Sequence, residues 1–185
     1  MASVDEPAGS VWIINPDELA KRIRDFESLE LLAANLASVQ RIEAWLYASL
    51  DAHQTIGVET VLSTPKYRAL VEHARGHGFS INLIYVFLDT VELNIERVQL
   101  RVDKGGHAVP EDRIRSRRTR SFEQFAWFFT EADRVDVYDN SGASPQLVMT
   151  KRDESIMVYD DLPSEIVDAV DTAVAGFKEV YEADD

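Results

Sequence analysis

The sequence lacks cysteine, so neither a disulfide nor a cysteine-based zinc site can form. It also lacks a long apolar run, because the stretch 81–88 is interrupted by Asn82 and is far too short to span a bilayer. The first ten residues are acidic and show neither the basic nor the apolar segment of a secretory signal. We therefore expect a cytoplasmic protein that has no membrane partner.

The histidines do not form a metal-binding pattern in the sequence. His73 and His77 share a helix face, but no glutamate lies between them as in a metalloprotease motif. The other two, His53 and His107, have no acidic partner at ligand spacing. The spacing therefore predicts no metal site.

Positive charge is scarce, since 19 lysines and arginines face 33 acids and the net charge is −14. Such a chain is not expected to bind nucleic acid or an anionic membrane. The positive charges are nevertheless concentrated, because residues 97–120 contain seven arginines and one lysine against three acids. A cationic segment within an acidic protein predicts a defined anionic ligand.

Length and hydrophobic pattern predict one α/β domain over residues 1–185. Short apolar runs, typical of strands, alternate with segments of helical periodicity, which favours a mostly parallel sheet flanked by helices. The nearly continuous run 79–88 predicts a strand that is covered on both faces. Strands are expected at 11–14, 55–58, 79–88 and 134–138, and a hairpin at 146–150 and 155–159. Helices are expected after Asn15-Pro16, over about 30–52, from Thr64-Pro65 to Gly76 or Gly78, from Asp89-Thr90 to about Arg101, from Pro110, and from Pro163.

Polar residues follow three of these strands, where parallel sheets bind ligands. Asp17 follows the first strand as a candidate general base, although an acid in the first turn of a helix is also a common capping residue, and we favour capping on local sequence. Glu59 and Thr60 follow the second strand and are equally compatible with orienting a substrate hydroxyl or with an ordinary strand end. Asp139 and Asn140 follow the fourth strand.

Arginines are densest at 113–120, where five occur in eight residues. Arg97 and Arg101 lie one helical turn apart and form a second pair on one face. Guanidinium groups match phosphate oxygens in a bidentate way. Both groups flank the Gly105-Gly106 loop, an arrangement that indicates a phosphate-closing lid. The alternatives are a solvated, partly acid-paired face and a nucleic-acid patch, which the net charge disfavours.

Five motifs now stand in one order along the chain. They are IINPDE (13–18), ETVLS (59–63), IERVQLRVDKGGHAVPED (95–112), IRSRRTRS (114–121) and VYDNSG (137–142). Their order and spacing resemble the zeta-toxin and UDP-N-acetylglucosamine kinase branch of the P-loop kinases. The resemblance spans roughly residues 11–142, and the GGHAVP stretch is its most specific part.

The resemblance implies a kinase that transfers a phosphoryl group from ATP, with Mg²⁺, to a small hydroxyl compound such as UDP-N-acetylglucosamine. It also implies an antitoxin-like protein as a partner. By position, Asp17 corresponds to the general base, and Glu59 and Thr60 to substrate contacts, with Val61 in place of a second threonine. The arginines around the phosphoryl group correspond to Arg97, Arg101 and Arg117, and cofactor contacts are expected from Arg120 and Asn140. Arg118 stands where the family often has tyrosine.

The chain departs from this family in one feature that its chemistry needs. The eight glycines do not form GxxxxGK[ST], so the amide cradle, the lysine and the hydroxyl that holds Mg²⁺ are missing from these 185 residues. The family's first strand, which is normally central, is missing with the loop, and we expect a gap in the sheet. Three hypotheses remain: a truncated or derived kinase, a non-catalytic module that binds a sugar nucleotide or a protein, and a kinase completed by a partner chain. For the sequence as given, we expect no appreciable kinase activity.

Overall fold

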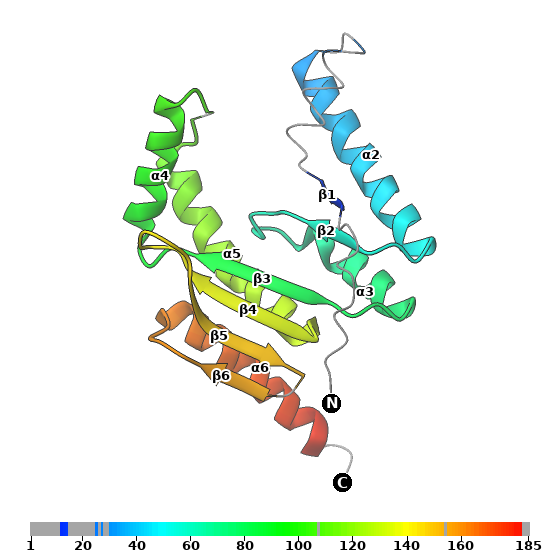
Figure 1. Ribbon diagram of the computed structural model, residues 1–185, viewed down its shortest axis with the longest axis vertical. Helices are drawn as coiled ribbons and strands as arrows, with labels where there is room; N and C mark the ends of the chain where they lie inside the picture. Colours follow the sequence, from blue (N-terminus) through cyan, green and yellow to red (C-terminus); the bar gives the residue numbers. More distant parts are fainter. Residues whose placement is uncertain are drawn as a thin grey trace, which may run out of the picture. The chain divides into compact units, whose positions relative to one another are not determined.

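A computed structural model describes residues 12–14, 25, 27, 30–106, 108–153 and 155–182. The described residues fall into two units, the first within 1–60 and 72–79 and the second within 61–71 and 80–185. Each unit has its own sheet (Figure 1). The single domain expected from the sequence therefore stays a prediction, and the two units are considered one at a time.

The first unit contains a parallel pair of short strands and one long helix. Strand β1 (Trp12–Ile14) pairs with β2 (Ile56–Val58), with Trp12 opposite Ile56. Helix α2 (Leu31–Asp51) precedes β2 and packs against it. Ile42, Leu46 and Leu50 recur every four residues and are buried on one face of α2, which confirms the amphipathic helix predicted over this stretch.

A helical segment begins in the second unit and ends in the first. It consists of the 3₁₀ turn η1 (Pro65–Tyr67) and helix α3 (Arg68–Gly76). Pro65 opens it after Thr64, as the sequence predicts. Gly78 has a φ of +78°, a conformation that glycine adopts at little cost, and it ends the helical path near the predicted residue.

The second unit is built on a four-stranded sheet in the order β3-β4-β5-β6. Strands β3 and β4 are parallel, whereas β5 is antiparallel to both of its neighbours. The prediction of a mostly parallel sheet is therefore wrong for this unit, because the tight connections before and after β5 leave no room for crossover helices. The strands are β3 (Asn82–Phe87), β4 (Arg134–Asp139), β5 (Gln146–Arg152) and β6 (Ser155–Val158).

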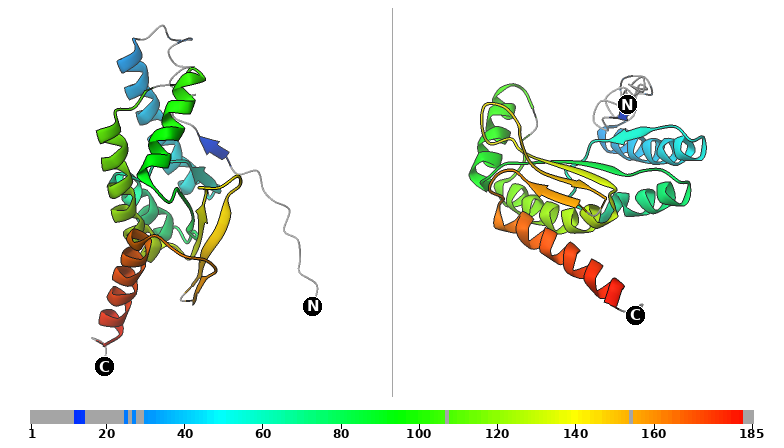
Figure 2. Two further views of the ribbon diagram at one scale, coloured as in Figure 1. Left: turned by 90° about the vertical axis from the view of Figure 1, so that its left-hand side faces the viewer. Right: turned by 60° about the horizontal axis from the view of Figure 1, so that its bottom comes forward.

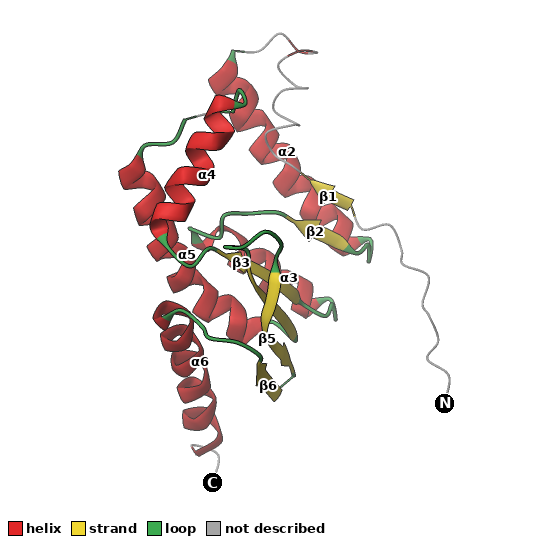
Figure 3. Ribbon diagram, turned by 60° about the vertical axis from the view of Figure 1, so that its left-hand side comes forward, coloured by secondary structure: helices red, strands yellow, loops and turns green. Residues whose placement is uncertain are grey.

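Three helices accompany this sheet. They are α4 (Val91–Asp103), α5 (Glu111–Glu131) and α6 (Ser164–Glu182), close to the predicted positions. Helices α5 and α6 pack against each other and cover one face of the sheet (Figures 2 and 3). Among the described residues, no helix combines the length and the apolar character needed to cross a membrane.

The core of the second unit lies between the sheet and α5. Phe125 and Phe129 are fully buried, and the ring of Phe125 lies 4.5 Å from that of Tyr85 on β3. Burial raises the pKa of Tyr85 to about 12. On the other face of β3, Ile84 is 69% exposed and Val86 is 52% exposed. The expectation that this strand is covered on both faces is therefore wrong, because the buried apolar partners come from α5 and α6 on one side only.

A buried lysine joins the end of α5 to the sheet. The side chain of Lys151 on β5 is almost completely buried, and its ammonium group donates to the carbonyl oxygens of Phe129 at 2.6 Å and Ala132 at 2.8 Å. The last carbonyls of a helix have no partner within the helix and carry its partial negative charge. Lys151 therefore satisfies the end of α5 within the core.

Replacing Lys151 by methionine keeps most of the side-chain volume but removes the donors. We expect the free energy of unfolding to fall by about 2 kcal/mol, because buried carbonyl groups lose a charged partner. Urea unfolding of Lys151→Met measures this loss. The matched control is Lys104→Met at the exposed end of α4, which should change stability by less than about 0.5 kcal/mol. Equal effects of the two variants would contradict the capping role.

Candidate functional site

The carboxyl ends of the parallel strands β3 and β4 are bound to each other through their loops. The amide of Asn140 donates to the carbonyl of Phe87 at 2.9 Å, and the amide of Asp89 donates to the hydroxyl of Ser141 at 2.7 Å. The carboxylate of Asp139 accepts from the amide of Ser141 at 2.8 Å. The VYDNSG motif therefore forms an ordered rim at the edge where parallel sheets bind ligands.

Arg118 on α5 binds the backbone that directly follows β3 at this rim. Its guanidinium group donates to the carbonyls of Leu88 and Asp89, the latter at 2.8 Å, and to the side chain of Asn94 at 3.3 Å. It also lies 3.6 Å from the carboxylate of Glu165 on α6, and its side chain is only 13% exposed. Arg118 thus joins the loop after β3 to α4, α5 and α6, and it holds this loop in place relative to the helices.

The sequence reasoning did not single out Arg118 for a role, although its helical register contained the signal. Ile114, Arg118 and Phe122 recur every four residues, and the two apolar members are buried. An arginine between two core positions of one helix face is expected to point inward. The side chain lies over the ring of Phe122, with 4.8 Å between the guanidinium carbon and the ring centroid.

The guanidinium group of Arg97, on α4, reaches the carboxyl end of β4. One of its amino groups donates to the carbonyl of Asn140, so the structure brings together two predicted site residues from different motifs. Arg97 is exposed, and a guanidinium group has five N–H donors, so most of its donors remain open to a ligand. Arg101, one turn further along α4, is also exposed.

The glycines of the GGHAVP stretch have a structural explanation. The amide of Gly105 donates to Val102 and that of Gly106 to Arg101, both at 2.9 Å, which is the Schellman ending of a helix. Gly105 has a φ of +89°, and a Cβ on Gly106 would lie 2.8 Å from the carbonyl oxygen of Arg101. This pair therefore ends α4 and fixes the backbone of Arg101, whatever else it does.

The arginines of α5 divide between structural and open positions. Arg120 donates to the carbonyl of Ser63, the last residue of the ETVLS motif, at 3.2 Å. Arg115 forms an exposed ion pair with Glu92 at 3.2 Å. The pKa of Glu92 is lowered, mainly by a hydrogen bond from its own backbone amide and then by the hydrogen bond from Arg115. Arg117 is exposed, and the described part of the chain gives it no ion pair.

The remaining predicted site residues lie in the other unit or outside the described residues. Glu59 and Thr60 follow β2, as expected, but belong to the first unit, whereas the arginines belong to the second. Asp17, the candidate base, lies outside the described residues. The geometry therefore joins Arg97 with Asn140 and Arg120 with the ETVLS motif, and it leaves the catalytic and hydroxyl-orienting predictions as predictions.

The described helices of the second unit do not fit the triphosphate of ATP. A polyphosphate is usually held by free amides at a helix N-terminus. Here the first turns of α4, α5 and α6 all contain an acid, and the hydroxyl of Thr90 already accepts from the amide of Leu93 at 3.3 Å. Negative side chains at these positions repel a polyphosphate.

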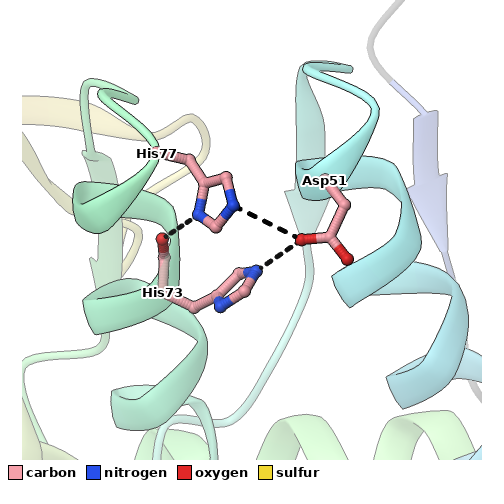
Figure 4. A group of neighbouring side chains, drawn as sticks. All are labelled: Asp51, His73 and His77. Atoms are coloured by element: carbon pink, nitrogen blue, oxygen red, sulfur yellow. Dashed lines mark hydrogen bonds and ion pairs between the residues drawn. The ribbon is translucent and has the colours of Figure 1, made fainter.

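A second group of polar side chains lies in the first unit. Asp51 is the last residue of α2, His73 lies in α3, and His77 directly follows it (Figure 4). The Nε2 atoms of His73 and His77 lie 2.8 and 3.5 Å from the same carboxylate oxygen of Asp51. The spacing of the histidines predicts no metal site and does not reveal this partner, because Asp51 lies 22 residues before His73. This group could hold a metal ion.

Comparison with known proteins identifies no family for the chain. No family model matches it, and no solved structure matches it. An uncharacterized protein of Haemophilus influenzae is 26% identical over 105 residues, which cover 57% of this chain and 73% of that protein. The function is therefore argued from the residues of this chain.

The role of Arg118 predicts a difference between two neighbouring arginines. Lysine cannot reproduce the fork that reaches two carbonyls, so Arg118→Lys should lower the free energy of unfolding by about 1–3 kcal/mol. Arg117→Lys, an exposed control one residue away, should change it by less than about 0.5 kcal/mol. Chemical denaturation of both variants measures the difference. A neutral Arg118→Lys would show that the rim does not depend on this side chain.

Proposed function

We propose that the chain is the acceptor-binding part of a zeta-toxin-like sugar-nucleotide kinase, and that it binds the phosphates of a sugar nucleotide such as UDP-N-acetylglucosamine. The observation that carries the proposal is the position of Arg97. Its guanidinium group is held by Asn140 at the carboxyl end of a parallel strand, with most of its donors exposed. Arg101 on the same helix face supplies a second cation, and Arg117 a third from α5.

Electrostatics support a small anion rather than a polyanion. The whole chain carries −14, so its long-range field repels nucleic acid and anionic surfaces. Arginine clusters act on phosphate at short range, where bidentate hydrogen bonds are formed. A sugar nucleotide carries a compact diphosphate and neutral hydroxyl groups, which suits a local group of arginines.

The proposal assigns no ATP site to these residues. The described helices lack the free amide cradle, and the sequence lacks the lysine-containing loop, so we derive no phosphoryl transfer from them. In this account the chain binds the acceptor without turnover. The role of Asp17 as general base is proposed only for a complete kinase.

A second candidate function is a complete kinase whose phosphate loop is supplied by a segment outside these 185 residues. Each unit offers a sheet edge to which a further strand could add, because among the described strands β2 pairs with β1 and β3 with β4. An in-frame GxxxxGK[ST] immediately upstream in the coding DNA would support this candidate, and a stop codon there would exclude it.

Calorimetric titration of the 185-residue protein with UDP-N-acetylglucosamine tests the proposal. We expect saturable binding at one site, weakened at least about tenfold in Arg97→Gln and in Arg101→Gln, because each removes a charged donor. ATP with Mg²⁺ should show no saturable binding. The matched control is Arg134→Gln, an exposed arginine at the amino end of β4, which should bind like the parent.

Two results would reject the proposal. One is the absence of any saturable heat with the sugar nucleotide. The other is an equal loss of affinity in Arg134→Gln, which would indicate a general charge effect. Saturable, magnesium-dependent binding of ATP would instead show that the assignment of the missing ATP site is wrong.

A further inference from the structure

The first unit contains a group of ligand atoms that the sugar-nucleotide proposal does not use. Asp51, His73 and His77 point toward one another from α2 and α3 (Figure 4). One oxygen or nitrogen atom from each lies within 4.8 Å of the others. The side chains of His73 and His77 are 32% and 35% exposed and that of Asp51 is 58% exposed, so an ion from solvent can reach them.

The hydrogen bonds of His77 decide which of its ring nitrogens can bind an ion. Its Nδ1 lies 2.9 Å from the carbonyl oxygen of His73. A carbonyl oxygen only accepts, so Nδ1 must carry the hydrogen and donate it. In the neutral ring, Nε2 then carries a lone pair. That lone pair would face a carboxylate oxygen of Asp51 at 3.5 Å, so either a proton on Nε2 or a metal ion must lie between the two atoms.

One separation between ligand atoms matches a small tetrahedral cation, and the other would have to widen. Bonds of about 2.0–2.2 Å to zinc place two tetrahedral ligands about 3.4 Å apart. The separation between His77 and Asp51 is 3.5 Å, whereas that between His73 and Asp51 is 2.8 Å, a hydrogen-bond distance that an ion would widen by about 0.6 Å. A histidine that binds a metal usually donates its other N–H to a carbonyl or carboxylate, as His77 does here.

We propose that Asp51, His73 and His77 bind a zinc ion, with the fourth position open to water or a small ligand. Two imidazoles and one carboxylate favour Zn²⁺ over Mg²⁺ or Ca²⁺, which prefer oxygen ligands. Three protein ligands with an open position are typical of reactive rather than purely structural zinc sites. His53 borders the site without belonging to the ligand set, since its ring stacks on Phe79 at 5.9 Å.

A metal-free interpretation must be distinguished from this one. The hydrogen bond from His73 to Asp51 would join α2 to α3 without any ion. Asp51→Asn separates the two interpretations, because the amide oxygen still accepts from His73 but the anionic ligand is lost. A simple helix-joining contact therefore survives this substitution, whereas a zinc site does not.

The experiment uses the whole 185-residue protein after removal of metals with EDTA and dialysis. Zinc chloride is titrated in competition with a chromophoric zinc chelator, and thermal unfolding is followed with and without zinc. We expect one zinc ion per chain and a melting temperature that rises with zinc concentration. Asp51→Asn and His77→Ala should each weaken binding by at least about tenfold. The matched control is Asp103→Asn, which removes an exposed acid at the end of α4 and should bind zinc like the parent.

Several outcomes would overturn the zinc site. They are the absence of saturable binding, unchanged affinity in both Asp51→Asn and His77→Ala, and an equal loss in Asp103→Asn. Circular dichroism of each variant without metal identifies one that fails to fold, and Asp51→Asn remains informative then because it preserves the helix contact. The sugar-nucleotide titration is done in EDTA, so the two proposals stand or fall separately.

Discussion

In the second unit, the attachment of the loop after β3 to the helices depends on the guanidinium group of Arg118. Parallel strands end at one edge, where their last carbonyls have no partner within the sheet. Arg118 supplies charged donors to Leu88 and Asp89 and reaches Asn94 on α4 and Glu165 on α6. Hydrogen bonds to a charged group contribute about 1.5–3 kcal/mol each when they are well made. Without this side chain, the carbonyls of Leu88 and Asp89 would lose their charged donor.

The rim in turn determines what the other arginines can do. Asn140 is bound to Phe87 through its amide, and its carbonyl holds Arg97, so Arg97 is oriented by a chain of contacts that begins in the sheet. A pre-oriented arginine loses less side-chain entropy when it binds a phosphate. The arginines of 97–120 are therefore not equivalent. Arg118 and Arg120 bind backbone and Arg115 pairs with an acid, whereas Arg97, Arg101 and Arg117 are exposed.

Much of this fold could be predicted because its signals are local. The apolar spacing of Ile42, Leu46 and Leu50 predicts α2, and Pro65 and Thr90 mark where helices begin. The exposure of Ile84 and Val86 could not be predicted, since a continuous apolar run does not reveal whether a second layer covers it. The antiparallel pairing of β5 with β4 follows from the short connection between them, which has no room for a crossover helix. The prediction of a mostly parallel sheet did not take this connection length into account.

The candidate sites show the same limit. The family resemblance suggests the arginines and Asn140 as site residues, whereas the division of the arginines into structural and exposed side chains depends on tertiary contacts such as that of Arg120 with Ser63. The meeting of Asp51 with His73 joins two helices across 22 residues, and no local pattern encodes it. The Gly105-Gly106 pair is interpreted from the sequence as part of a phosphate-closing lid, whereas in the structure it ends α4.

NMR of the arginine side chains tests most directly whether Arg97 and Arg101 bind the sugar nucleotide while Arg118 keeps its structural contacts. The Nε–Hε signals of the ¹⁵N-labelled protein are assigned with single Arg→Lys variants and followed during addition of UDP-N-acetylglucosamine. The account predicts that the signals of Arg97 and Arg101 move in a saturable way while that of Arg118 stays in place. Movement of the Arg118 signal alone, or of Arg134 at the opposite end of β4, would contradict it.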